Sequence, residues 1–451
     1  MNTIAKLFSK LAKNPLLLQS LWSLIARFAG VALNFAVVII ITNQLTKSSA
    51  GDILLLMTFV TGVALISRLG IDQLLMKEIA SSHHQSLEFR TGFLKISYKA
   101  VLLLSLAFML IWIAASPYLQ SSFFSDDSRP TVTTLELIIA SVGVLFFNLV
   151  ILNSTYLKAI KKTVLGVLGQ NALTAITFLF VILIFWGYFS NNQYVFYLYT
   201  ASLVAAGTLA ALFTRHVISK YSYIPAEISE QSRSDSSLVP GLIDVIKKSI
   251  PLAPISIISY LMIFTDTIMV GWFLSNEQVA EYSVASRVSY IVLFFLQAME
   301  ATIYPRLLNK FKHKQSQIHA FFWQSTALVI SVVFGVTLFM YLLSDYILMA
   351  FGSEYGTAKQ ALGLLLIAQF FRAASITFSF MFIIREKVQY LNMILMTAFI
   401  VNVAGNIVLI QRYAIEGAAL ATLIANVTLL GLILLLFYKQ KLLKLIVGSE
   451  S

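Results

Sequence analysis

The chain has 451 residues, of which 59% are hydrophobic and 12% are charged, and its mean hydropathy is +0.84. About a quarter of the residues of a typical soluble domain are charged, so this composition excludes an ordinary soluble protein and favours a polytopic membrane protein. The formal net charge is +12, and the absence of cysteine excludes disulfides, thiolate metal sites and cysteine nucleophiles.

Apolar segments separated by polar clusters predict twelve membrane-spanning segments. Backbone groups inside a bilayer must satisfy their hydrogen bonds within the segment, and the alternating pattern of barrel strands is absent, so the segments are predicted to be helices. The first follows three lysines and is expected to be an uncleaved span. The twelve spans are predicted at about residues 16–41, 52–72, 98–116, 133–156, 164–188, 194–214, 250–274, 281–304, 322–344, 360–383, 389–411 and 415–438.

The distribution of Lys and Arg predicts the orientation of these spans. Of the 32 basic residues, 24 fall in the alternate segments that share a side with the N-terminus, four lie on the opposite side and four lie within spans. The positive-inside rule therefore places both termini in the cytoplasm. Because the basic loops would contact anionic lipid, the positive charge does not indicate nucleic-acid binding. All five histidines fall in predicted cytoplasmic loops, which argues against an intramembrane metal site.

A polar segment divides the chain into two groups of six spans. It lies in the longest predicted loop, which gives an N-terminal lobe (1–215), a cytoplasmic linker (216–248) and a C-terminal lobe (249–451). The stretch LTKSSAGDILLL, which begins at Leu45, is similar to LSNEQVAEYSVA, which begins at Leu274. Six spans per lobe give both lobes the same orientation, so the lobes are predicted to be parallel repeats.

Polar residues recur at helical spacing in several predicted spans, most clearly in the first, second, seventh, eighth and tenth. A charge that faces lipid at mid-membrane costs several kcal/mol, so these stripes are expected to line a central, hydrated cavity. An excess of arginine over acid at its centre favours an anionic substrate, because guanidinium binds phosphate through two hydrogen bonds. The candidate cavity residues are Ser23, Arg27, Asn34, Ser259, Asp266, Arg287, Tyr290, Gln297, Glu300, Gln369 and Arg372.

Two acids in these spans each have two possible roles. Asp266 is expected either to be the counter-ion that orients Arg287, across a short periplasmic turn, or to be a protonatable coupling site. Glu300 either takes part in coupling or forms an ion pair with Arg306 or a neighbouring helix. No catalytic residue, metal site or cofactor is predicted.

The stretch PLAPISIISYLMIFTDTIMVGWFLSNEQVAEYSVASRV resembles the middle of bacterial polysaccharide flippases of the O-antigen type, in the multidrug/oligosaccharidyl-lipid/polysaccharide (MOP) exporter superfamily. Asp266, Glu281 and Tyr282 match the family's pattern there. The stretches AGDILLLMTFVTGVALISRLGIDQLLMKEIA, FGSEYGTAKQALGLL and YAIEGAALATLIAN agree as well.

The resemblance implies a fold like that of the multidrug and toxic compound extrusion (MATE) transporters, with two six-helix lobes around a cavity. It implies movement of an undecaprenyl-diphosphate-linked oligosaccharide from the cytoplasmic to the periplasmic leaflet of the bacterial inner membrane. Alternating access would be coupled to H⁺ or Na⁺, and a polysaccharide polymerase and a chain-length regulator are the expected partners. Arg27, Arg287 and Arg372 are the candidates for the family's cationic lumen, where they would hold the diphosphate.

Two other functions remain open from the sequence. A multidrug or organic-cation antiporter would share the fold, but a site for cations should be net acidic. A membrane-integral polysaccharide polymerase or glycosyltransferase generally has sizeable periplasmic loops, whereas the longest one predicted here spans residues 117–132.

Overall fold

The computed structural model of the chain describes residues 15–81, 87–126, 129–189, 192–221, 240–313 and 317–440. Helices make up nearly all of these ranges, and the only β-structure described is an antiparallel pair of two-residue strands. The all-α fold predicted from the sequence is therefore confirmed. Part of the predicted linker (222–239) and the basic residues near both ends of the chain lie outside the described residues.

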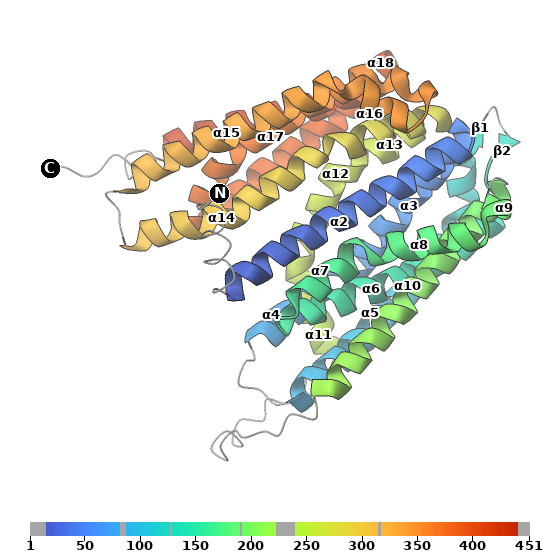
Figure 1. Ribbon diagram of the computed structural model, residues 1–451, viewed down its shortest axis with the longest axis horizontal. Coiled ribbons are helices and arrows are strands. Elements are labelled where there is room, and N and C mark those ends of the chain that lie inside the picture. Colours follow the sequence, from blue (N-terminus) through green and yellow to red (C-terminus); the bar gives the residue numbers. More distant parts are fainter. Residues whose placement is uncertain are drawn as a thin grey trace, which may run out of the picture. The chain divides into compact units, whose positions relative to one another are not determined.

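The elements follow one another along the chain as Figure 1 labels them. In the first half they are α2 (Pro15–Gln44), α3 (Lys47–Arg68), α4 (Ile71–Ser81), α5 (Leu87–Phe123), β1 (Ser125–Asp126), β2 (Arg129–Pro130), α6 (Thr134–Ala159), α7 (Thr163–Asn171), α8 (Leu173–Ile184), α9 (Trp186–Phe189) and α10 (Asn192–Tyr221). In the second half they are α11 (Leu242–Ser249), η2 (Ile250–Leu252), α12 (Ala253–Phe273), α13 (Asn276–Ser289), α14 (Ile291–His313), α15 (Ile318–Leu342), α16 (Ser344–Ala350), η4 (Ser353–Ala358), α17 (Lys359–Ile384) and α18 (Val388–Lys439).

Many of these helices are long and apolar enough to cross a bilayer. Within the described part of the chain there are nine such helices, or ten if α7 and α8, which meet at a bend of 48°, form one broken span. The apolar part of α12, Tyr260–Phe273, is shorter than these. The protein is therefore a multi-pass membrane protein, and the total of twelve spans remains a prediction.

Helix α18 folds back on itself and so contains two of the predicted spans. Its backbone leaves helical geometry at Tyr413 (φ −130°, ψ 15°) and Ala414 (φ 48°, ψ −129°). The side-chain amide of Asn402 lies 3.4 Å from the Thr422 hydroxyl, on the other side of this break. Asn402 and Thr422 lie at similar distances along the chain from the break, one on each side. The two halves of α18 therefore form an antiparallel hairpin, which brings residues near 402–406 beside residues near 422.

The described chain forms two compact units. The first draws its residues from 1–45 and 56–259, and the second from 46–55 and 260–451. The first ten residues of this second unit come from the start of α3. Helix α12 is also divided, because the first unit ends at Ser259 and the second continues at Tyr260.

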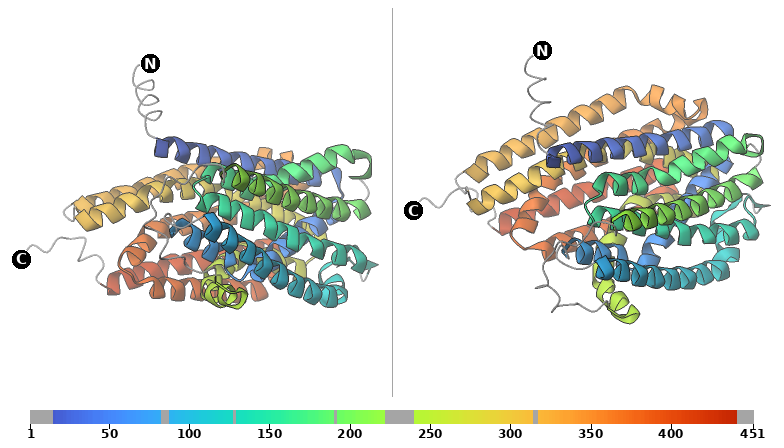
Figure 2. Two further views of the ribbon diagram at one scale, coloured as in Figure 1. Left: turned by 90° about the horizontal axis from the view of Figure 1, so that it is seen from below. Right: turned by 60° about the horizontal axis from the view of Figure 1, so that its bottom comes forward.

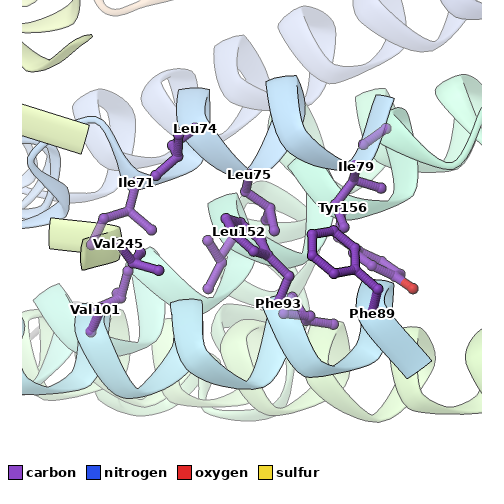
Figure 3. Close-up of a cluster of buried hydrophobic side chains, with 13 residues drawn as sticks. Ile71, Leu74, Leu75, Ile79, Phe89, Phe93, Val101, Leu152, Tyr156 and Val245 are labelled. Carbon is purple, nitrogen blue, oxygen red and sulfur yellow. The ribbon is translucent and has the colours of Figure 1, made fainter. Parts of the chain in front are cut away.

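The first unit is organised around α6, which packs against α5, α7 and α10, and Figure 2 shows α10 (green) running beside α6 (teal). One of its cores is formed where the short helix α4 meets α5, α6 and α11 (Figure 3). Ile71, Leu74, Leu75 and Ile79 recur at helical spacing on α4, so their side chains form one apolar stripe that is buried in this core. Val245 from α11 is fully buried in the same cluster, which attaches this short helix to the first unit.

A buried polar network lies deeper in the first unit. The Asn148 side-chain oxygen accepts a hydrogen bond of 2.6 Å from the Arg68 guanidinium, and its amide donates bonds of 2.8 Å to the hydroxyls of Ser67 and Ser105. Arg68 also forms a salt bridge of 3.7 Å with Asp72. The amide of Asn148 is therefore fully used, and it compensates much of the cost of burying Arg68.

The second unit is built mainly from helices that pack along α17. Helix α17 contacts α18 most extensively and also packs on α13, α14 and α15 (Figure 1). Fully buried Ala361, Ala368 and Ala373 on α17 are small residues of the kind that allow membrane helices to approach closely. This packing places the polar residues of α12, α13, α17 and α18 in one region, where the candidate site lies.

Candidate functional site

Asp266 on α12 lies in a cage of uncharged hydrogen-bond donors, and only 3% of its surface is exposed. Its Oδ1 accepts bonds of 2.9 Å from the side-chain amide of Asn402 and 2.6 Å from that of Asn406. Its Oδ2 accepts a bond of 2.9 Å from the Tyr282 hydroxyl and another from the Thr422 hydroxyl. We call these five residues the Asp266 cage.

The local sequence explains why these donors converge. Asn402 and Asn406 are four residues apart and therefore lie on one face of the first half of α18. The hairpin at Tyr413 brings Thr422 from the second half of α18 to the same level. Tyr282 reaches the carboxylate from α13 and is itself 1% exposed. Three helical elements are therefore needed to build the cage.

The chemistry of the cage suits a single monovalent cation or a proton. A buried carboxylate is strongly destabilised unless its charge is compensated, and none of the four donors carries a positive charge. The Oδ1 atom of Asn406 is buried without a hydrogen-bond partner, so the cage also contains an unused oxygen acceptor. Amide, hydroxyl and carboxylate oxygens are ligands for hard cations. Among the described residues no group of three or more His, Cys, Asp or Glu residues could hold a metal ion, and the single acid here is a weak match for a divalent ion.

The sequence suggested Arg287 as the neighbour of Asp266, but none of the four donors in the cage is Arg287. Tyr290, at the C-terminal end of α13, lies near Asp266, Arg287 and Arg372. Its hydroxyl donates a bond of 2.5 Å to the main-chain oxygen of Ile263. Tyr290 is therefore a neighbour of both the cage and these two arginines.

Arg372 on α17 also has an acidic neighbour. It interacts electrostatically with Glu300 on α14 as well as with Tyr290, so three of the predicted cavity residues lie close together. Gln369, one turn earlier on α17, is 2% exposed, and its Oε1 is buried without a hydrogen-bond partner. These four side chains form a second polar group beside the cage, which we call the Arg372 cluster (Tyr290, Glu300, Gln369 and Arg372).

The other predicted residues lie on α2, α12 and α14. Gln297 is exposed on α14. Arg27 is exposed and Ser23 half-buried on α2, in the first unit. The Asn34 amide donates bonds of 2.8 Å to the main-chain oxygens of Gly30 and Asn171. It therefore supplies a hydrogen-bond donor to the carbonyl group of Asn171, where α7 ends at the bend into α8. The side chain of Ser259 lies outside the described residues.

A further set of contacts in the second unit joins α13 to the first turns of α3. Lys47 forms a salt bridge with Glu281, and the Asn276 amide donates a bond of 2.7 Å to Asp52. When LTKSSAGDILLL is aligned with LSNEQVAEYSVA, Lys47 corresponds to Asn276 and Asp52 corresponds to Glu281. Lys47 therefore contacts the counterpart of Asp52, and Asp52 contacts the counterpart of Lys47, as in an interface with two-fold symmetry. We call these four residues the clasp.

Two further features support the clasp. Glu281 also accepts a bond of 2.7 Å from the Thr357 hydroxyl, and Lys47 donates one of 3.3 Å to the main-chain oxygen of Glu354. A Cβ atom on Gly51 would lie 1.8 Å from the main-chain oxygen of Asn276, so only glycine permits this approach of α3 to α13.

Several of these residues were not predicted from the sequence. Asn402 and Asn406 were visible as an amide pair at helical spacing in an otherwise apolar span, and this was the signal to use. Thr422 offered no such signal, because threonine in a membrane helix usually bonds its own backbone or packs against a neighbour.

Comparisons with known proteins agree with this architecture. A family model described as "Polysaccharide biosynthesis protein" matches residues 16–311. The probable low-salt glycan biosynthesis flippase Agl15 of Haloferax volcanii is 31% identical over 179 residues, which are 37% of this chain. The chain spans only 36% of the length of this curated relative.

Solved structures show the same fold at low sequence identity. The lipid II flippase MurJ in an inward closed conformation matches 95% of this chain and 90% of its own, with a TM-score of 0.72 and 14% identity. An inward-facing multidrug resistance MATE family transporter of the MOP superfamily matches 94% of this chain and 99% of its own, with a TM-score of 0.63 and 14% identity. Since the family model covers well over half of its length, the chain belongs to the polysaccharide biosynthesis protein family.

Proposed function

We propose that the protein is a flippase that moves a lipid-linked oligosaccharide from the cytoplasmic to the periplasmic leaflet. The family assignment supports the substrate class, and two similar proteins, Agl15 and MurJ, bear the name of flippase. The proposed carrier lipid is undecaprenyl diphosphate, and the proposed cargo is an O-antigen or similar repeat unit. The proposed site is the bacterial cytoplasmic membrane, with both termini in the cytoplasm.

The observation that carries this proposal is the position of Arg372 in the second unit. It is an arginine in a membrane-spanning helix, beside Tyr290 and Glu300 rather than in a loop. Guanidinium stays charged in partly dehydrated surroundings and binds a diphosphate through paired hydrogen bonds. Arg372 and Arg287 would bind the diphosphate in the second unit, and Arg27 would contribute from the first.

The Asp266 cage supports a role in coupling to an ion gradient. In this proposal the cage takes up H⁺ or Na⁺, which neutralises the buried carboxylate. Tyr290 has both Asp266 and Arg372 as neighbours, so in this proposal a change of charge at Asp266 alters the electrostatic environment of Arg372. Two sites that affect each other's binding in this way are coupled reciprocally.

The clasp would be one of the contacts that alternating access breaks and reforms. Its two pairs connect residues that the sequence assigns to different lobes, and both are polar contacts that can be replaced by water. A polysaccharide polymerase and a chain-length regulator are the proposed protein partners downstream.

The test is a flipping assay in sealed vesicles. The full-length protein is reconstituted with a fluorescent undecaprenyl-diphosphate oligosaccharide, and a reagent that acts only outside the vesicles measures how much substrate has crossed. Arg372→Ala should reduce the initial rate at least tenfold, and Arg372→Lys should recover only part of it. Arg385→Ala is the matched control, because Arg385 follows the end of the same helix, where it lies over the Phe311 ring, outside the Arg372 cluster.

Two outcomes would overturn the proposal. One is wild-type protein that fails to move the lipid-linked oligosaccharide under any imposed H⁺ or Na⁺ gradient. The other is wild-type protein that exports an organic cation against such a gradient, which would identify the antiporter of the same fold.

A further inference from the structure

An apolar cavity lies on the second unit between α15, α17 and the second half of α18. Its volume is about 990 Å³, near the upper end of the range of small-molecule pockets. Phe334 and Leu338 of α15 and Ile367 of α17 line it and remain 45–56% exposed, so the cavity opens sideways at the outer surface of the unit. Both α15 and α17 are long, apolar helices of membrane-spanning type, so an opening between them lies within the depth of a bilayer.

The lining is polar at one end and apolar at the other. Lys359 and Gln360 line it at the first turn of α17, and Glu416 lines it just after the turn that divides α18. Phe370 and Phe371 line it in the middle of α17. From Lys359 to Phe370 is eleven residues, which is about 16 Å along a helix at 1.5 Å per residue. The hydrocarbon core of a bilayer is about 30 Å thick, so the cavity is as deep as one leaflet.

From these observations we infer that the cavity binds one phospholipid with a zwitterionic head group that carries a phosphate and a primary ammonium. Its acyl chain lies along Phe334, Ile367 and Phe370, and its head group lies at the rim. The orientation predicted from the sequence puts the first turn of α17 on the periplasmic side, so the lipid comes from the outer leaflet.

The charges at the rim select this head group. Glu416 is half-buried, and it forms no salt bridge with a described residue, so its carboxylate is available to an ammonium group. Lys359 forms a salt bridge of 2.7 Å with the exposed Asp345, so it offers a partly neutralised positive charge to the phosphate. Two acids and one lysine at the rim disfavour a lipid whose head group is only negative, including a prenyl diphosphate.

The lining also contains an unused polar atom below the rim. The hydroxyl oxygen of Thr337 is buried without a hydrogen-bond partner, and it belongs to the lining of the cavity. Tyr341, one turn further along α15, lies at the level of Gly363, because a Cβ atom on Gly363 would be 3.1 Å from its ring. Thr337 is therefore deeper than the rim, where the ester groups of a bound lipid lie and offer acceptors to its hydroxyl.

Native mass spectrometry of the purified full-length protein tests this site. After delipidation the protein is offered equal amounts of phosphatidylethanolamine and phosphatidylglycerol, and the lipid retained per protein is counted. The wild type should retain one phosphatidylethanolamine, with at least a tenfold preference over phosphatidylglycerol. Glu416→Gln should reduce that preference to less than threefold, and Gly363→Trp, which fills the cavity beside Tyr341, should reduce retention at least tenfold.

Gly431→Trp is the matched control, because a side chain at Gly431 meets open space and lies outside the lining. Its retention should equal that of the wild type. If Gly363→Trp does not fold, the head-group preference of Glu416→Gln decides the question by itself. Equal retention of both lipids by the wild type, the same loss in Gly431→Trp, or displacement by an undecaprenyl diphosphate would each overturn the assignment.

Discussion

The side-chain amide of Asn406 donates a hydrogen bond of 2.6 Å to the carboxylate of Asp266, 140 residues earlier in the chain. This contact, repeated by Asn402, surrounds a buried acid with neutral donors instead of a positively charged partner. Hydrogen bonds alone recover only part of the cost of burying a charge. In the proposed function an H⁺ or Na⁺ completes this compensation, which makes Asp266 the most informative residue to change.

Asp266→Asn should abolish the response of transport to an H⁺ or Na⁺ gradient while the protein remains folded. The amide keeps one oxygen acceptor for Asn402 and Asn406, and the hydroxyls of Tyr282 and Thr422 can turn to accept from its NH₂ group. The measurement is the flipping rate in vesicles with and without an imposed gradient, together with the melting temperature in detergent. Asp345→Asn, the same change at an exposed acid, should behave as the wild type. Gradient-driven flipping by Asp266→Asn would exclude the coupling role.

Reversal of the Lys47–Glu281 salt bridge should rescue the loss caused by either single change. Lys47→Glu and Glu281→Lys each place two like charges together in a mostly buried position, and we expect each to cost about 2–4 kcal/mol of stability in the clasp. The double variant restores an opposite pair and should regain at least half of this loss, since contacting residues couple by about 0.5–3 kcal/mol. The melting temperatures of the wild type, the two single variants and the double variant complete a double-mutant cycle. Additive losses would show that the two residues do not interact.

Gly51→Ala should destabilise the protein, although alanine is normally better than glycine in a helix by up to about 1 kcal/mol. The added Cβ would lie 1.8 Å from the main-chain oxygen of Asn276, so α3 must move away from α13 and the clasp must lengthen. The control is Gly335→Ala on α15, where the added methyl group meets nothing within 4 Å. We expect opposite signs for the two changes in melting temperature. A Gly51→Ala variant as stable as Gly335→Ala would contradict the close approach of the two helices.

Asn148→Leu should destabilise the first unit by about 2 kcal/mol or more, because it leaves the buried Arg68 guanidinium without its 2.6 Å acceptor. Ser105→Ala removes only the acceptor of one N–H of the Asn148 amide and should cost about 1 kcal/mol. Thermal unfolding in detergent measures both. Equal losses in the two variants would indicate that Arg68 does not depend on Asn148.

The fold class and the family resemblance follow from the sequence alone. Long apolar segments must form helices, because only a helix satisfies its own backbone hydrogen bonds in lipid. The motifs around Asp266, Glu281 and Tyr282 carried the family resemblance, and the similarity of LTKSSAGDILLL to LSNEQVAEYSVA indicated related stretches. The polar stripes in the predicted spans also indicated that Asp266, Tyr290, Glu300 and Arg372 should lie close together inside the protein, since charged groups avoid hydrocarbon.

The contacts between individual side chains depend on how the helices pack, which the sequence pattern does not give. Helical spacing fixes the face on which a residue lies, but not how the helix is rotated against its neighbours or where a bend occurs. The hairpin at Tyr413 brings Thr422 beside Asn402 and thereby completes the cage, whereas the sequence suggested Arg287 as the partner of Asp266. The two pairs of the clasp, Lys47–Glu281 and Asp52–Asn276, likewise need α3 and α13 to approach closely. Gly51 permits this approach because it has no side chain to meet the backbone of α13.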